Sequence, residues 1–140
     1  MRLRHLIATL VLPLATHALA YGQDLVVVVG RGSAVSAVSA YEIGHVFLGR
    51  LSGLSGVGTV HPMELRDDHD ARLRFHAEIA GMSEHKLRAH WAAMVLTGRA
   101  RPPQRMGSIE ELKERLKADA QAIAYVRREH LDGSLKQVYP

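Results

Sequence analysis

The segment from Asp24 to Val29, which reads DLVVVV, limits the fold of this chain more than any other feature. Consecutive β-branched residues favour an extended backbone, and the absence of polar positions among them indicates a strand that is buried on both faces. Gly30, Arg31, Gly32 and Ser33 then interrupt the run. The segment therefore predicts a central strand of a sheet, followed by a loop.

Start and stop signals for helices occur along the rest of the chain. Ser39 with Glu42, and Ser108 with Glu111, have the spacing of capping boxes, and Gly81 is suited to end a helix. The predicted helices run from Ser39 to Leu48, from an N-cap at Asp70 to Ala80, from Ser83 to Thr97, and from Ser108 onward; further strands are predicted over residues 57–65, 122–126 and 135–139. Strands that alternate with helices predict an α/β fold, a mixed β-sheet flanked by helices.

The first twenty residues have the layout of a secretory signal peptide. Arg2 and Arg4 precede an apolar run that is too short to span a bilayer, and Ala18 to Ala20 end it with a small-x-small pattern. We expect cleavage after Ala20 and a periplasmic protein with one domain over residues 21–140. An uncleaved N-terminal membrane anchor is the alternative. The chain has no cysteine, so disulfides and thiolate metal sites are excluded.

Charge and motifs argue against several classes of function. The net charge of +4 includes Arg2 and Arg4 of the predicted signal peptide, and a balance this small predicts no nucleic-acid partner. The loop at Gly30 lacks the third glycine of a dinucleotide-binding motif, since position 35 is valine. No spacing of nucleophile and base suggests a catalytic site. The sequence thus predicts a protein that is not an enzyme and has no cofactor.

The order of several segments resembles a known family. They are VFLGR at residues 46–50, the Arg-Asp turn and helix at 66–75, WAAMVLTGRARPP at 91–103, and AIAYV at 122–126. This order is similar to short exported proteins related to the phosphate-binding components of ABC transporters. The resemblance implies one lobe of a periplasmic-binding-protein-like fold. Full-length phosphate binders close two lobes over the anion, so a homodimer is one way to complete such a site.

The same resemblance implies candidate ligand residues. Arg66 and Asp68 match the Arg and Asp that open the family's phosphate-binding turn, but His69, Asp70 and Ala71 replace the hydroxyl-bearing triplet that follows. Asp70 as an N-cap would accept the free amides of the helix and bring a negative charge to the site. Two further candidates lie in the loop after the first strand, where α/β sheets place ligands. The predicted contacts for a small anion such as phosphate are Arg31, Ser33, Arg66, Asp68 and Asp70.

Two other interpretations stay open at this stage. The lost hydroxyl triplet favours an accessory or sensory module of the same fold, which binds no ligand and acts on a membrane transporter or sensor partner. The crowding of Asp67, Asp68, His69 and Asp70 also permits a divalent cation site, although a solvated acidic turn explains it as well and no metal site is predicted.

Overall fold

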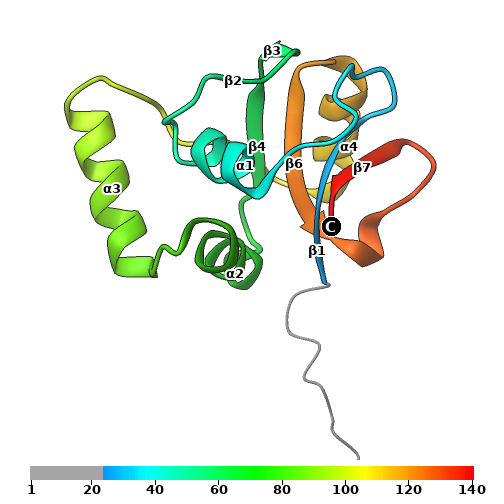
Figure 1. The fold of residues 1–140 in the computed structure, drawn as a ribbon. Helices are drawn as coiled ribbons and strands as arrows, with labels where there is room; N and C mark the ends of the chain where they lie inside the picture. The colour runs from blue at the N-terminus through cyan, green and yellow to red at the C-terminus, as the bar shows by residue number, and fades with distance from the viewer. Residues whose placement is uncertain (1–23) are drawn as a thin grey trace, which may run out of the picture.

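A five-stranded sheet lies at the centre of the computed structural model, which describes residues 24–140 (Figure 1). The predicted signal peptide lies outside the described residues. The strand order is β5 (Gln104–Met106), β4 (His61–Leu65), β6 (Ala122–Arg127), β1 (Leu25–Gly30) and β7 (Leu135–Tyr139). The sheet contains both parallel and antiparallel pairs of strands, which confirms the predicted mixed sheet.

The direction of β1 has the largest consequence for function. β4 pairs in parallel with both β5 and β6, whereas β1 is antiparallel to β6 and to β7. Leu25, at the start of β1, lies opposite Arg127, at the end of β6. The carboxyl end of β1 therefore lies at the opposite end of the sheet from the carboxyl ends of β4, β5 and β6.

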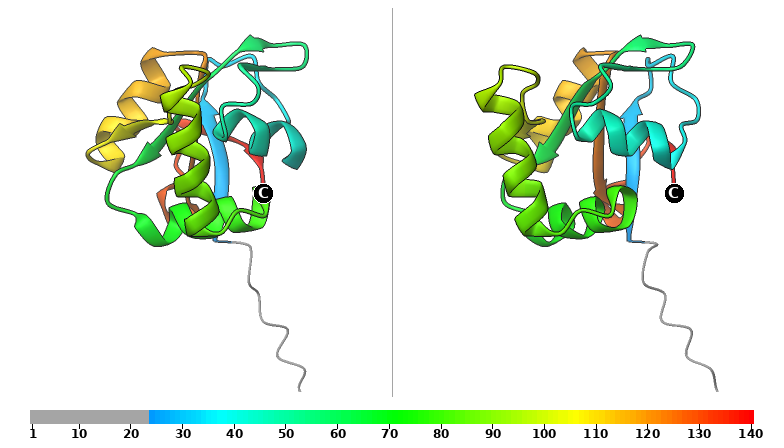
Figure 2. Two further views of the ribbon diagram at one scale, coloured as in Figure 1. Left: turned by 90° about the vertical axis from the view of Figure 1, so that its left-hand side faces the viewer. Right: turned by 60° about the vertical axis from the view of Figure 1, so that its left-hand side comes forward.

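Helices cover both faces of the sheet, as the apolar character of β1 predicts (Figures 1 and 2). Alternate side chains of β1, beginning with Leu25, pack in a cluster with α1 (Ala40–Phe47) and α2 (His69–Ala80). The intervening valines pack against α4 (Ile109–Ala118) on the other face. Every residue of β1 is buried, which confirms the strand interpretation.

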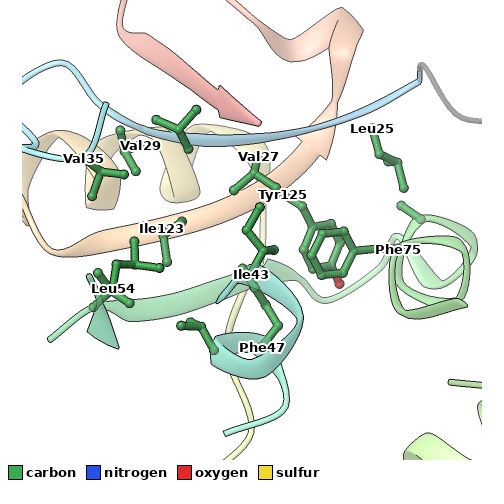
Figure 3. Close-up of a cluster of buried hydrophobic side chains, with 14 residues drawn as sticks. Leu25, Val27, Val29, Val35, Ile43, Phe47, Leu54, Phe75, Ile123 and Tyr125 are labelled. Atoms are coloured by element: carbon green, nitrogen blue, oxygen red, sulfur yellow. The ribbon is translucent and has the colours of Figure 1, made fainter. Parts of the chain in front are cut away.

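Aromatic rings join α1 and α2 to the sheet. The rings of Phe75 and Tyr125 are stacked with centroids 4.0 Å apart, and Phe47 meets both rings edge-on. Figure 3 shows these rings beside the aliphatic side chains of β1 and of α1. This packing fixes α2 over the end of the sheet where β6 terminates.

The helix caps confirm most of the local predictions and correct two. Ser39 forms the complete capping box with Glu42, and Gly81 ends α2 with a φ of 61°. The predicted N-cap at Asp70 is wrong, because Asp68 caps α2 by accepting a hydrogen bond from the amide of Ala71 at 3.2 Å. Asp70 lies in the first turn of the helix instead.

The second predicted capping box is only half formed. Ser108 accepts a hydrogen bond from the amide of Glu111 at 3.1 Å, but the Glu111 carboxylate accepts from the amide of Gly107 at 2.6 Å. The carboxylate therefore reaches one residue further back than the motif requires.

Two strand predictions are also revised. The segment 57–65 divides into β3 (Gly58–Thr59), which pairs with β2 (Gly53–Leu54) in a separate two-stranded sheet, and β4. β5 was not predicted. It has only three residues and follows two prolines, so its own sequence carries no periodic signal.

Helix α3 (Glu84–Leu96) stands to one side of the sheet (Figures 1 and 2). Leu87 and Trp91 pack against Leu48, whereas Val95, near the end of the helix, is 54% exposed. A short 3₁₀ helix, η1 (Arg128–His130), follows β6. Within residues 24–140, no helix combines the length and apolar character needed to cross a bilayer.

Candidate functional site

The five ligand contacts predicted from the sequence fall into two groups at opposite ends of the sheet. Arg31 and Ser33 follow β1, whereas Arg66, Asp68 and Asp70 follow β4. The separation follows from the antiparallel direction of β1 relative to β6, because β4 and β6 run in parallel. The structure therefore does not bring the two groups into one site.

Arg31 and Ser33 take part in contacts that hold their loop. The Arg31 Nε donates a hydrogen bond to the carbonyl of Gly133 at 2.8 Å. Ser33 is buried; its hydroxyl oxygen accepts from the amide of Val35, and its carbonyl accepts from Lys136 Nζ at 2.7 Å. These bonds fasten the loop to the segment that leads into and begins β7.

At the other end of the sheet, Arg127 binds the acidic groups of the turn. Its guanidinium donates to both oxygens of Asp68 at 2.7 and 2.8 Å, to Asp70 at 3.1 Å and to Asp24 at 3.2 Å. Arg74 lies 3.5 Å from Asp24 and 3.7 Å from Asp70. We call these five residues the Arg127 network. Two arginines share three carboxylates in it, so its formal charge is negative.

The hydrogen bonds from Arg127 hold the pKa of the Asp68 carboxyl below its usual value, because they favour the ionised form. A cleft of about 360 Å³ adjoins this carboxylate, and Asp67, Glu129 and His130 also line it. Arg66 is exposed, and its amide donates to the carbonyl of Met106 at 3.0 Å. The cleft itself is thus more acidic than basic.

A second polar cluster lies under α2, around a carboxylate that the sequence analysis did not select. Glu64 is 1% exposed, and its two oxygens accept from different partners. The Tyr125 hydroxyl donates to Oε2 at 2.9 Å, and Arg105 Nε donates to Oε1 at 3.0 Å. Arg72 Nε forms an ion pair with the same Oε1 at 3.3 Å. We call these four residues the Glu64 network.

Four elements supply the Glu64 network, with Tyr125 contributed by β6. Glu64 and Arg105 are partners in the parallel register of β4 and β5, and Arg72 comes from the first turn of α2. Burial and the neighbouring Glu64 raise the pKa of Tyr125, so its hydroxyl keeps the proton that it donates. Two guanidinium groups share one carboxylate here, and the network carries a net positive charge.

The arginines of this network open onto a pocket of about 700 Å³, which we call the arginine pocket. Its lining consists of His69, Arg72, Glu84, Arg88, Trp91, Pro102, Pro103 and Arg105. Glu84 pairs with Arg88 at 3.0 Å and lies 3.7 Å from His69. Apolar walls and guanidinium groups therefore meet in one cavity beside the start of α2.

The sequence carries little local signal for this pocket. The one local signal is a carboxylate at position 64 between apolar neighbours in a predicted strand. Its partners come from residues 72, 105 and 125, which the pairing of β4 with β5 and β6 and the packing of α2 on the sheet bring together.

The cation-site interpretation of the turn finds no support in the geometry. Across residues 24–140, no three His, Asp or Glu side chains gather in a group that could hold a metal ion. Asp68 and Asp70 bind Arg127 instead.

Comparisons with known proteins identify the fold. No family model matches the chain, and no curated protein matches it. Among solved structures, an ABC-type phosphate transport receptor from Vibrio cholerae matches with a TM-score of 0.52 and 14% identity, covering 82% of this chain and 45% of that one. A protein described as a phosphate ABC transporter substrate-binding protein with bound phosphate, from Clostridium perfringens, matches with a TM-score of 0.61 and 13% identity, covering 82% and 44%. PstS from Borrelia burgdorferi matches with a TM-score of 0.57 and 11% identity, covering 83% and 46%.

These likenesses show that the chain has a periplasmic-binding-protein-like fold, the one seen in phosphate ABC transporter substrate-binding proteins. The expected resemblance is confirmed at the level of structure. The chain spans less than half the length of these structures, in agreement with the expectation of one lobe.

Proposed function

We propose that this chain is an exported solute-binding protein that takes a small oxyanion, such as phosphate, in the arginine pocket. The observation that carries the proposal is the 2:1 ratio of arginine to carboxylate in the Glu64 network, next to an open cavity. The fold shared with phosphate-binding proteins supports the same class of ligand.

Electrostatics favour the arginine pocket over the turn. In the pocket, Arg72 and Arg105 are held by a buried carboxylate, so their positions are set before a ligand arrives. At the turn, an anion would meet Asp67, Asp68 and Glu129 in the adjoining cleft. Like charges at this spacing repel, and the Asp68 side chain already occupies the amide of Ala71 that would otherwise bind an anion.

The predicted ligand residues enter this proposal in different roles. Arg66 is exposed beside the turn, and we propose it as a contact for an approaching anion. Asp68 and Asp70 hold the start of α2 through Arg127, which places His69 and Arg72 at the pocket. Arg31 and Ser33 lie at the other end of the sheet and do not belong to the proposed site.

The first experiment is a calorimetric titration of the purified chain with phosphate and sulfate at low ionic strength. We expect saturable binding that Arg105→Gln weakens at least tenfold. Arg31→Gln is the matched control, since it removes an arginine at the opposite end of the sheet and should leave the affinity unchanged.

Thermal unfolding of each variant checks that the fold is retained. Absence of saturable binding for either anion would refute the proposal. Binding that Arg31→Gln abolishes and Arg105→Gln preserves would move the site to the loop after β1.

We further propose that the chain reaches the periplasm through its signal peptide and acts with a membrane transporter or sensor. A second copy of the chain would supply the lobe that longer relatives carry within one polypeptide. Sedimentation with and without phosphate tests this point: the proposal expects a dimer that the anion stabilises, and a monomer at high concentration in both conditions contradicts it.

One observation favours the alternative function, a ligand-free interaction module. Leu96 is 88% exposed and Val95 is 54% exposed at the end of α3, which leaves apolar surface uncovered. A chain that binds neither anion, yet associates with itself or a partner in a manner lost in Leu96→Glu, would support this alternative.

A further inference from the structure

We infer that the ligand that the arginine pocket binds most tightly is an organic monocarboxylate with an apolar or aromatic body, in preference to free phosphate. The inference rests on the proposed function, because it specifies the chemical class of oxyanion that the same pocket takes. Three properties of the pocket support it: its size, its walls and its charge.

The size of the pocket exceeds the needs of an inorganic anion. A volume of about 700 Å³ lies within the range of roughly 300 to 1,000 Å³ that is typical of sites for organic ligands. A phosphate ion bound to Arg72 and Arg105 would leave most of this space to water. A ligand with a body attached to its charged group would fill it.

The walls of the pocket suit an apolar body. Trp91, Pro102 and Pro103 line the cavity together with the arginines. Trp91 is only 7% exposed and packs in a cluster with Leu48 and Leu87, so the indole is held in place without a ligand. Preformed aromatic and proline surfaces bind apolar groups with little loss of side-chain entropy.

The charge of the pocket suits one carboxylate. Three arginines line it, and two carboxylates pair with them: Glu64 with Arg72 and Arg105, and Glu84 with Arg88. The formal sum over these arginines and carboxylates is one positive charge, which a monocarboxylate neutralises and a phosphate dianion exceeds.

The guanidinium groups of Arg72 and Arg105 both line the pocket and could bind a further anion. Their side-chain contacts to Glu64 run through Nε. Arg72 Nε lies at ion-pair distance but donates no hydrogen bond to the carboxylate within the described part of the chain. The terminal amino groups of a guanidinium form the fork that a carboxylate binds in two places.

Trp91 makes the test direct, because it is the only tryptophan in the chain. Its fluorescence is recorded while the full chain is titrated with cyclohexanecarboxylate, acetate, cyclohexylmethanol and phosphate. We expect cyclohexanecarboxylate to bind at least tenfold more tightly than acetate or phosphate, and the uncharged alcohol not to bind. Calorimetry on the same samples confirms each affinity.

Two variants test the charged half of the pocket. Arg105→Gln should weaken cyclohexanecarboxylate at least tenfold, and Arg88→Gln, which leaves the Glu64 network intact, should weaken it to a smaller extent. Arg101→Gln is the matched control, an exposed arginine between α3 and β5 that does not line this pocket, and should have no effect.

The outcomes separate this inference from the proposed function. Saturable phosphate binding that equals or exceeds cyclohexanecarboxylate binding would overturn the inference and leave the proposed function standing. Equal affinities for acetate and cyclohexanecarboxylate would show that the apolar walls do not contribute to binding. That result would also overturn the inference. Saturable binding of cyclohexanecarboxylate with none of phosphate or sulfate would refute an inorganic anion as the ligand and support the inference. If phosphate, sulfate and the carboxylates all fail to bind, both the proposed function and the inference fail.

Discussion

The Glu64 network and the Arg127 network lie at neighbouring positions of one sheet. Arginines outnumber carboxylates in the first network, and carboxylates outnumber arginines in the second. In the first, two arginines share a single carboxylate that is 1% exposed. In the second, two arginines share three carboxylates, and the side chains of Asp24 and Asp70 are 52% and 67% exposed. One network has spare positive charge next to a cavity, and the other has spare negative charge facing water.

The difference shows why an arginine in an acidic turn is a weak predictor of an anion site. Removing one partner from a buried ion pair leaves an uncompensated charge, whereas exposed pairs are screened by solvent. The burial of the carboxylates and the ratio of arginines to carboxylates together decide which arginines can bind a further anion. Substitutions in and around the two networks test this difference.

The largest effect is expected at the buried carboxylate. Glu64→Gln leaves Arg72 and Arg105 without their counter-charge, and we expect the free energy of unfolding to fall by about 3 to 5 kcal/mol. Urea unfolding at pH 7 measures the loss. Glu114→Gln, at an exposed position of α4, is the matched control and should change stability by less than about 0.5 kcal/mol. A loss below about 1 kcal/mol for Glu64→Gln would show that the pair is not effectively buried.

The next effect concerns His76, which α2 places in the core. Its ring is 1% exposed, and neither nitrogen has a hydrogen-bond partner within the described residues. Burial, together with the charge of Arg72, lowers its pKa to about 4. The unfolded chain binds a proton near pH 6.5, so stability is full above that pH and decreases as the pH falls toward 4, by about 3 kcal/mol in total.

Unfolding curves at pH 7.5, 5.5 and 4.5 measure this dependence. His76→Phe should make stability nearly independent of pH between 7.5 and 5.5. The phenylalanine ring cannot be protonated, and it takes the place of the histidine ring beside Phe75 and Tyr125. His85→Gln, at an exposed position of α3, should keep the wild-type dependence. An unchanged pH profile in His76→Phe would contradict the prediction.

A moderate effect is expected in the Arg127 network. Asp68→Ala removes both the cap of α2 and the paired hydrogen bonds to Arg127, and we expect a loss of about 1 to 2 kcal/mol at pH 7. The pKa of Asp68 is lowered in the folded state, so this contribution is present above about pH 4 and is lost as the pH falls through the lower folded value.

Thermal and urea unfolding at pH 7 and pH 3 measure this contribution. Asp67→Ala provides the comparison, since Asp67 is exposed and adjacent but does not cap the helix. Equal losses in the two variants would mean that the cap and the Arg127 bonds contribute nothing specific.

The smallest effect is expected at the edge of the same network. Arg74 lies 3.5 Å from Asp24 and 3.7 Å from Asp70, and both carboxylates are exposed. Arg74→Gln should cost at most about 0.5 kcal/mol, and less at high salt. A loss above about 1 kcal/mol that salt does not reduce would contradict the contrast between the two networks.

Local chemistry made much of the fold predictable. The valine run of β1 is buried along its whole length, Ser39 and Ser83 cap the helices that they were expected to cap, and Gly81 ends α2 in the left-handed conformation. Each of these features depends on residues within a few positions of one another. The error at Asp70 arose because Asp68 and Asp70 are two residues apart and offer the same capping chemistry.

The candidate site was much less predictable, because it depends on strand direction. The sequence indicates a polar turn at Arg66 to Asp70 and a loop at Arg31 to Ser33, and it predicts that the two segments form one ligand site. A run of valines carries no information on whether its neighbours are parallel or antiparallel, since the side chains alternate between the two faces in either case.

Local signals in the sequence predicted most of the strand and helix segments, most of their caps and the class of fold, because hydrophobic period and capping act over short distances along the chain. The folded structure was needed to show that β1 runs against β6, and that Glu64, Arg72, Arg105 and Tyr125 form one network. Those residues are up to 61 positions apart, and they meet because β4 pairs with β5 and β6 and because α2 packs on the sheet. The arginine pocket is therefore a property of the folded sheet and of no single segment.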